Sequence, residues 1–223
     1  RLVAGFAELG TTKVRLTGGE PMVRKDFMEI VRVVRATPGI ERLAMTTNGY
    51  KLCETADELK AAGVDAINIS IDSLESERFE EITGDRRFAK VFESIDTCLE
   101  AGFGAVKLNT VLLKGLNDHE LPGFFEYVRS RPIALRFIEL MQTGDNQAYF
   151  EKRHVSGDVV RRKLDDEGWK PVDRGPVDGP AVEYGHPDHA GRIGLIAPYA
   201  PGFCDTCNRL RVTARGGLRL CLF

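Results

Sequence analysis

The sequence lacks a long apolar run, a strong excess of charge of one sign and a dense set of cysteines. No stretch approaches the roughly 20 consecutive apolar residues that a membrane-spanning helix needs, and we expect no signal peptide in this stretch. The 31 Lys and Arg against 33 Asp and Glu give a net charge of −2. Nothing global therefore indicates binding to nucleic acid or to an anionic membrane, so local basic positions must carry any anion binding.

Five cysteines are an odd number and too few for a disulfide framework in 223 residues. This usage favours a reducing, cytoplasmic location, where clustered cysteines bind metal more often than they form disulfides. Cys53 and Cys98 stand alone in segments with helical spacing, and we interpret them as packing residues. With 43% hydrophobic and 29% charged residues, the composition is that of a soluble globular protein.

Strand and helix patterns alternate through the first 140 residues. Repeated units of this size predict parallel strands joined by right-handed crossovers, with the chemistry at the C-terminal strand ends. The predicted strands are 13–17, 42–46, 65–71, 105–113 and 133–140. The predicted helices are 26–36, 54–62, 88–101 and 118–130, with helix ends at Gly63 and Gly102.

The pattern changes after about residue 145, so we expect a first domain of residues 1–145 and a C-terminal extension of residues 146–223. The extension is predicted to contain a helix at 155–167, strands at 181–184 and 192–197, and a hairpin of 209–213 and 218–222. Helical spacing begins at Arg1 and a strand pattern ends at Phe223. We therefore expect an internal fragment of a longer protein.

A Gly-Gly-Glu-Pro segment, residues 18–21, follows the first predicted strand and precedes a helix. A backbone without side chains allows a ligand to approach closely, and the carboxylate of Glu20 can accept hydrogen bonds from an amino group. By itself the segment is also an ordinary strand-to-helix turn. Its spacing is neither that of a Walker loop nor that of a dinucleotide fingerprint.

Cys204, Cys207 and Cys221 have the spacing of metal ligands, a Cys-x2-Cys pair and a third cysteine after thirteen intervening residues. A structural zinc site uses four ligands, and His186 or His189 could be the fourth. A four-iron cluster held by three cysteines instead leaves one iron open to a substrate. From these residues alone, both sites are possible.

Several arginines and lysines lie within predicted strands. Arg209 and Arg211 alternate and so face one side of a strand, where two guanidinium groups suit a polyphosphate. A solvated strand face is the plain alternative. Arg15, Lys107 and Arg136 are also in strands, and a charge that faces inward is costly unless it meets an anion.

Five segments together resemble the GTP 3′,8-cyclase family, the radical S-adenosylmethionine (SAM) enzymes known as molybdenum cofactor biosynthesis protein A. They are Arg15–Pro21 (RLTGGEP), Thr46–Gly49 (TTNG), Asn68–Asp72 (NISID), Arg136–Met141 (RFIELM) and Phe203–Arg211 (FCDTCNRLR). The resemblance covers nearly the whole chain. Gly-Gly-Glu-Pro marks only the superfamily, whereas Cys-Asn-Arg-Leu-Arg with its gap to Cys221 is specific to the cyclases.

The resemblance implies an α/β fold, a partial (β/α)6 TIM-like barrel whose strands two to six are present here, with a C-terminal α+β extension that carries an iron–sulfur site. It implies a SAM site of Gly19, Glu20, Ser70 and Met141. It implies a GTP site of Arg15, Thr46, Lys107, Arg209, Leu210 and Arg211. Cys204, Cys207 and Cys221 would hold a 4Fe-4S cluster whose open iron binds the guanine base.

One part of the family pattern is missing. Members carry a Cys-x3-Cys-x2-Cys motif near the N-terminus, which holds the 4Fe-4S cluster that cleaves SAM, and a Gly-Gly tail at the C-terminus. Neither is found in residues 1–223. We therefore expect the cluster motif to lie before Arg1 and this fragment alone to be inactive.

The reaction implied by the resemblance starts when the N-terminal cluster gives one electron to SAM. The resulting 5′-deoxyadenosyl radical removes the 3′ hydrogen of GTP, and attack of C3′ on C8 gives 3′,8-cyclo-7,8-dihydro-GTP. The implied partners are an electron donor, the downstream cyclic pyranopterin monophosphate synthase and a second copy of the protein in a homodimer. Two alternatives remain open: another radical SAM enzyme with an auxiliary cluster, or a non-catalytic zinc-binding fragment.

Overall fold

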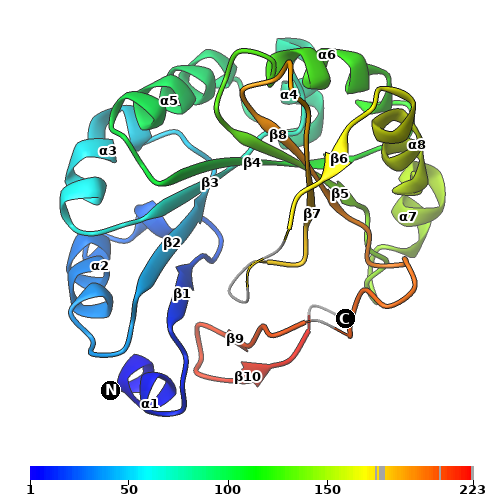
Figure 1. Cartoon of the computed structure of the whole chain (residues 1–223). Coiled ribbons are helices and arrows are strands. Elements are labelled where there is room, and N and C mark those ends of the chain that lie inside the picture. The colour runs from blue at the N-terminus through cyan, green and yellow to red at the C-terminus, as the bar shows by residue number, and fades with distance from the viewer. Residues whose placement is uncertain (174, 176–178, 206, 222–223) are drawn as a thin grey trace. The chain divides into compact units, whose positions relative to one another are not determined.

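The computed structural model of the chain describes residues 1–173, 175, 179–205 and 207–221. The chain divides into two compact units (Figure 1). Unit 1 comprises residues 1–71 and 79–108, and unit 2 comprises residues 72–78 and 109–223. The boundary between them passes through a strand, β4 (Ala105–Leu112).

Unit 1 alternates strands and helices along the chain. Its elements are α1 (Leu2–Glu8), β1 (Lys13–Leu16), the 3₁₀ helix η1 (Pro21–Val23), α2 (Phe27–Arg35), β2 (Arg42–Thr47), α3 (Leu52–Ala61), β3 (Ala66–Ser70), most of α4 (Ser76–Thr83), α5 (Phe88–Glu100) and the first half of β4. The strands β1, β2 and β3 pair in parallel in that order, and β4 follows β3. The predicted parallel α/β arrangement is confirmed.

The parallel register decides which side chains share a face of these strands. Arg15 pairs with Ala44, and Thr46 pairs with Asn68. Because side chains alternate along a strand, these four lie on one face, which we call the polar face. The opposite face carries the fully buried side chains Leu43, Met45, Ile67 and Ile69. Figure 1 shows α2, α3 and α5 on one side of these strands, and this apolar face packs against them.

The helices of unit 1 follow the apolar spacing that predicts them. On α2 the buried residues are Phe27, Val31 and Val34, which lie four and three positions apart and so form one stripe. The predicted helix ends are also confirmed, because Gly63 and Gly102 follow α3 and α5 with φ of 91° and 69°. Glycine adopts this left-handed backbone without steric cost.

Unit 2 contains the second half of β4 and the C-terminal elements. These are η2 (Asp118–Glu120), α6 (Leu121–Tyr127), β5 (Ala134–Glu139), α7 (Gln147–Arg153), α8 (Asp158–Asp166), β6 (Lys170–Pro171), β7 (Val182–Gly185), β8 (Arg192–Ile196), β9 (Arg211–Val212) and β10 (Leu218–Arg219). The order is β4-β5-β8-β7-β6, with β8 parallel to β5 and antiparallel to β7. In the described residues no strand pairing closes a ring.

Three expectations about elements need correction. The predicted helix at 118–130 is split into η2 and α6 and ends at Tyr127. The helices α4 and α7 were not predicted, because α4 buries only Phe79 and α7 buries no residue fully, so neither has an apolar stripe. The hairpin of β9 and β10 is present but shorter than predicted, and Leu222 and Phe223 lie outside the described residues.

No helix among the described residues combines the length and the apolar character that crossing a bilayer requires. Cys53 and Cys98 are free thiols, the first half-buried and the second buried. Burial raises the pKa of the Cys98 thiol to about 12. Both cysteines are therefore packing residues, as the sequence predicts.

Arg136 on β5 is only 5% exposed, and its charge is met by the chain itself. Its Nη2 lies 2.7 Å from Oε1 of Glu183 on β7. Strand β8 lies between β5 and β7, and Gly194 on β8 is the register partner of both residues. A Cβ on Gly194 would lie 2.7 Å from Cγ of Arg136, so the arginine crosses β8 where there is no side chain.

We predict that Gly194→Ala destabilises the protein by about 2 kcal/mol, because the added methyl group must displace the buried Arg136 side chain. The matched control is Gly185→Ala on the neighbouring strand, where the added Cβ meets only Val172 at an ordinary 3.5 Å. Urea denaturation midpoints measure both variants. Equal midpoints would show that Arg136 does not depend on the gap at Gly194.

Candidate functional site

The carboxylate of Glu20 is held in place at the end of β1. Its Oε1 accepts hydrogen bonds from the backbone N–H of Met22 at 3.1 Å and from Oγ1 of Thr47 at 2.9 Å. Its Oε2 accepts one from the backbone N–H of Asn48 at 2.7 Å. A carboxylate offers about four acceptor positions, so these three bonds fix its orientation and leave capacity for a donor from a ligand.

The two glycines before Glu20 leave this edge of the sheet open. Gly18 and Gly19 are exposed, and a Cβ added to either would meet no atom within 4 Å. Pro21, buried at the start of η1, fixes the turn that follows. The segment therefore offers bare backbone beside an oriented carboxylate, which suits a ligand that carries an amino group.

Sequence reasoning missed the residues that hold Glu20. Thr47 is 2% exposed, and its hydroxyl accepts a bond from the Gly49 N–H at 3.1 Å while it donates to Glu20. The side chain of Asn48 in turn accepts from the N–H of Tyr50 at 3.2 Å. The Thr-Thr-Asn-Gly segment was the available signal, since such residues hydrogen-bond to backbone at turns.

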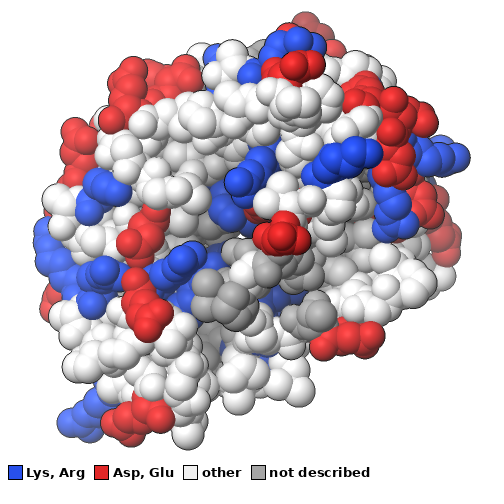
Figure 2. Space-filling model, in the orientation of Figure 1, with Lys and Arg blue, Asp and Glu red and all other residues white. Residues whose placement is uncertain are grey.

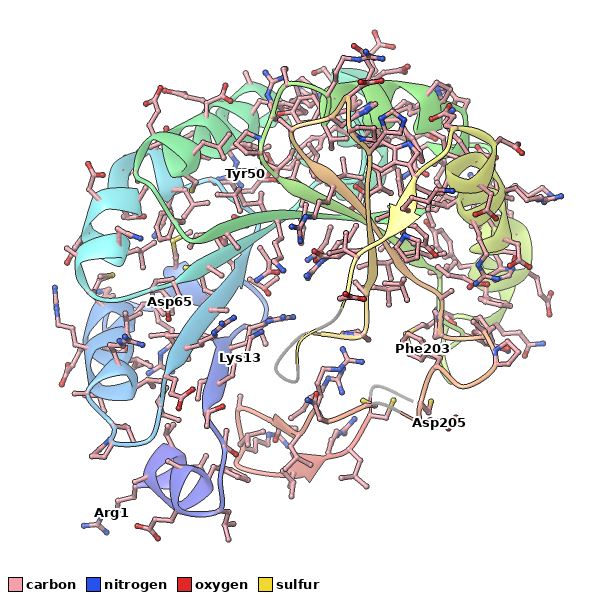
Figure 3. All side chains as sticks on the ribbon, viewed as in Figure 1. Arg1, Lys13, Tyr50, Asp65, Phe203 and Asp205 are labelled. Carbon is pink, nitrogen blue, oxygen red and sulfur yellow. The ribbon has the colours of Figure 1, made fainter. Side chains whose placement is uncertain are left out.

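Basic side chains gather at β1 and β2 on the polar face. Lys13 pairs with Arg42 in the parallel register, two positions before the pair of Arg15 and Ala44. Arg15 and Arg42 are exposed and Lys13 is half-buried. Figure 2 shows Lys and Arg over this part of the surface, and Figure 3 labels Lys13 on β1. The sequence alone does not single out Arg42, because its pairing with Lys13 depends on the strand register.

The remaining predicted residues of unit 1 lie on the polar face or at its C-terminal edge. Thr46 is half-buried on β2, and Ser70 is the exposed last residue of β3. Lys107 is half-buried on β4 between the buried Val106 and Leu108, which places it on the less buried face of that strand. Each of the three lies on a strand that the sequence predicts, and their roles as site residues stay predictions.

Two buried amide oxygens have no hydrogen-bond partner among the described residues, Oδ1 of Asn68 in unit 1 and Oδ1 of Asn109 in unit 2. Buried polar atoms are almost always paired. An unpaired buried acceptor therefore indicates a position where a ligand or a water molecule donates a hydrogen bond. Asn68 lies on the polar face beside Thr46.

Asp72 follows β3 and connects segments of unit 2. Its Oδ1 accepts a bond from the Val111 N–H at 2.8 Å, and its carbonyl accepts one from Nδ2 of Asn117 at 2.6 Å. Loss of hydration raises the pKa of the Asp72 carboxyl to about 6, and the bond from Val111 opposes this only in part. Asp72 thus acts as a structural link at the end of its motif.

Met141 in unit 2 is half-buried after β5. The loop that carries it is fixed by two bonds, one from Nδ2 of Asn146 to the Met141 carbonyl at 2.9 Å and one from the Gln142 N–H to the hydroxyl oxygen of Tyr199 at 2.7 Å. Its position is therefore defined by the fold of unit 2.

The β9–β10 hairpin separates arginines from aliphatic side chains. Arg211 pairs with Arg219, and Val212 pairs with Leu218. Arg209 and Arg211 are half-buried, whereas Leu210 and Val212 between and after them are 52% and 41% exposed. Within β9 the half-buried Arg211 and the exposed Val212 thus point to opposite sides, and Arg209 and Leu210, which precede the strand, show the same order of burial.

The three clustered cysteines are free and exposed at the ends of this hairpin. Figure 3 shows sulfur atoms next to the labelled Phe203 and Asp205. The pKa of the Cys207 thiol is lowered, first by a backbone hydrogen bond at Arg209 and then by the side chains of Arg209 and Arg211. Because the thiolate is the metal-binding form, this set of donors suits iron–sulfur ligation.

A zinc site at the three cysteines stays a prediction from the sequence. Among the described residues, the group of three possible metal ligands within 4.8 Å of one another is Glu75, His119 and Glu120. His186 and His189 instead contact each other through their Nδ1 atoms at 3.1 Å and pack against Trp169.

Comparisons with known proteins show which family the chain belongs to. The model of the radical SAM superfamily matches residues 1–128, and the model named Molybdenum Cofactor Synthesis C matches residues 133–223. The proteins named GTP 3′,8-cyclase from Aeromonas hydrophila and Stenotrophomonas maltophilia strain K279a are each 53% identical over 223 residues. The chain belongs to the GTP 3′,8-cyclase family of the radical SAM superfamily.

These matches cover 100% of the chain and 65% and 68% of the two relatives. The protein of the same name from Synechococcus elongatus is 51% identical, again over 68% of its length. The chain thus spans about two thirds of the relatives it matches. The radical SAM family implies a 4Fe-4S cluster and SAM as cofactors.

Solved structures support the fold at low identity. The match to the crystal structure of Streptococcus suis SuiB covers 97% of this chain and 51% of the SuiB chain, with a TM-score of 0.70 and 12% identity. The match to HydG, a maturase of the [FeFe]-hydrogenase, covers 73% of this chain and 40% of the HydG chain, with a TM-score of 0.55 and 16% identity. The likeness confirms the predicted radical SAM α/β fold, while the domain boundary at residue 145 stays a prediction.

We predict that Asp72→Asn stabilises the protein at pH 7.5 and that this gain shrinks as the pH falls to 5. The folded pKa of about 6 is above the ordinary value of 3.8, so the folded state holds the proton more tightly and loses stability as the pH rises through 6. The asparagine keeps an acceptor for Val111 without titrating. Denaturant midpoints at the two pH values test this, and a gain independent of pH would contradict it.

Proposed function

We propose that the protein carrying this chain converts GTP to 3′,8-cyclo-7,8-dihydro-GTP in molybdenum cofactor biosynthesis. The observation that carries the proposal is the polar face of unit 1, where Arg15 and Thr46 lie on β1 and β2, the strands that end beside an oriented Glu20. Lys107 lies on the less buried face of β4. Whole-chain similarity to proteins named GTP 3′,8-cyclase supports the choice of GTP.

Glu20 is the proposed acceptor for the amino group of SAM. Its three fixed hydrogen bonds prevent rotation of the carboxylate, and its remaining acceptor position can bind an ammonium group. Gly19 would allow the amino acid part of SAM to approach the backbone. Ser70 and Met141 are further proposed SAM contacts, carried over from the family resemblance. The open surface at Gly19 supports this assignment.

Arg15 and Lys107 are the proposed partners of the triphosphate, and Thr46 offers a hydroxyl for a hydrogen bond. Guanidinium and ammonium groups bind phosphate oxygens with charge-assisted hydrogen bonds. Arg209, Leu210 and Arg211 are further proposed GTP contacts, carried over from the family resemblance. The separation of arginines from aliphatic residues in the hairpin supports a ligand on the arginine side.

Cys204, Cys207 and Cys221 would hold the second 4Fe-4S cluster. Their free state and the lowered pKa of Cys207 support this assignment. When bound, the family's clusters supply the electron that starts radical chemistry with SAM and an open iron that can bind a base. The residues of this chain contribute binding, orientation and the exclusion of water around the nucleotide.

The proposed reaction needs further partners. One electron must enter to cleave SAM, and a second electron with one proton must reduce the cyclised radical to the 7,8-dihydro product, so an electron donor is required. The product is a strained cyclic nucleotide, and the downstream cyclic pyranopterin monophosphate synthase is the proposed enzyme that consumes it. A homodimer remains a prediction from the family resemblance.

The proposal is tested with the full-length protein, both clusters loaded, under anaerobic conditions. Incubation with GTP, SAM and a reductant is expected to give 3′,8-cyclo-7,8-dihydro-GTP, identified by its chromatographic separation from the isomeric GTP and by transfer of deuterium from 3′-labelled GTP to 5′-deoxyadenosine. SAM cleavage without a cyclised product from GTP would favour another radical SAM enzyme with an auxiliary cluster.

We predict that Lys107→Ala raises the KM for GTP by about tenfold or more, because a charge-assisted bond is worth about 1.5–3 kcal/mol. Reductive SAM cleavage without GTP is expected to stay within about twofold of the wild type. Lys152→Ala, an exposed residue on α7, is the matched control for loss of a lysine. An unchanged KM for GTP in the Lys107 variant would remove Lys107 from the proposed site.

A further inference from the structure

Asn68 on β3 carries a buried acceptor that the protein itself does not use. Its side chain is 1% exposed, and its Oδ1 has no hydrogen-bond partner among the described residues. Its Nδ2 donates to the carbonyl of Met45 at 2.8 Å. This bond decides which end of the amide is oxygen, because the reverse orientation would place two oxygens together. The orphan atom is therefore an acceptor, and its partner must be a donor.

The register places this acceptor in the middle of the polar face. Arg15 pairs with Ala44, and Ala44 pairs with Ala66, which gives the first row. Thr46 and Asn68 form the next row, about 6.6 Å further along the strands. Ser70 lies two residues beyond Asn68 on the same side, at the C-terminal edge. Asn68 thus lies between the row that contains Arg15 and the edge where SAM is proposed to bind.

The chemistry of GTP matches this order. A triphosphate suits the row that contains Arg15, but at neutral pH it has no hydrogen-bond donor for an amide oxygen. The ribose adjoins the triphosphate and carries two hydroxyl groups, each of which can donate a hydrogen bond. Thr46, directly beside Asn68, is also a proposed GTP residue, so the acceptor is next to the nucleotide rather than at the amino acid end of SAM.

We propose that Oδ1 of Asn68 accepts a hydrogen bond from a ribose hydroxyl of bound GTP and so fixes the sugar whose 3′ hydrogen is removed. The inference rests on the proposed function. Because the oxygen is buried in the ligand-free chain, the ribose must displace the side chains that cover it. Asn68 would then discriminate between ribonucleotides and nucleotides that lack one hydroxyl.

The test compares GTP with 2′-deoxy-GTP and 3′-deoxy-GTP on the full-length protein with its clusters loaded and SAM present. Equilibrium dialysis gives the affinity of each nucleotide for the wild type and for Asn68→Leu. The wild type is expected to bind one deoxy analogue about five- to tenfold more weakly than GTP. The leucine variant is expected to bind that analogue and GTP equally, with SAM affinity within about twofold of the wild type.

A second readout separates this role from a structural one. Asn68→Leu removes an unsatisfied buried acceptor but also the bond from Nδ2 to the Met45 carbonyl. Because the two effects oppose each other, the ligand-free variant is expected to have a urea midpoint close to that of the wild type. Asn68→Ser is the smaller change for use if the leucine variant does not fold, and its shorter side chain is expected to lose the same preference.

Three results would overturn the inference. They are equal binding of GTP and both analogues by the wild type, a preference for GTP that persists in either variant, and a fall in SAM affinity as large as the fall in GTP affinity. Persistence of the preference would mean that the oxygen binds only a water molecule. Failure of the proposed function looks different, because the wild type would then bind GTP weakly and form no cyclised product.

Discussion

Side-chain alternation in the parallel strands is the constraint on which the site in unit 1 depends. It sends Leu43, Met45, Ile67 and Ile69 into the layer covered by helices, and the same register leaves Arg15, Thr46 and Asn68 on the polar face. A slip of one residue would exchange the two sets. Burial of the apolar face therefore fixes the fold and also the order of Arg15, Thr46 and Asn68 along the polar face.

Periodicity predicted this arrangement because its signals are local. The stripe of Phe27, Val31 and Val34 and the glycine ends at Gly63 and Gly102 are each contained in one segment. The helices α4 and α7 escaped prediction because they lack such a stripe. Their formation depends on packing against distant segments, which one sequence does not reveal.

The site shows the same limit. The family resemblance gave Glu20 a role but gave none to Thr47 and Asn48, which lie 27 and 28 positions further along the chain and hold Glu20 by hydrogen bonds. Arg136 was expected to meet an anion, and that anion is Glu183, reached across the gap at Gly194. Pairings across strands come from register, and register is not visible in a single motif.

The central claim is that the three clustered cysteines hold a cluster on the nucleotide side. The most direct test is iron, acid-labile sulfide and zinc per chain after anaerobic purification, with Cys207→Ala as the test variant and Cys53→Ala as the control. For a protein of residues 1–223, in which the Cys-x3-Cys-x2-Cys motif is not found, the account predicts about four iron and four sulfide per chain, lost in Cys207→Ala and kept in Cys53→Ala. About one zinc and little iron would contradict it and make the cysteines a structural site.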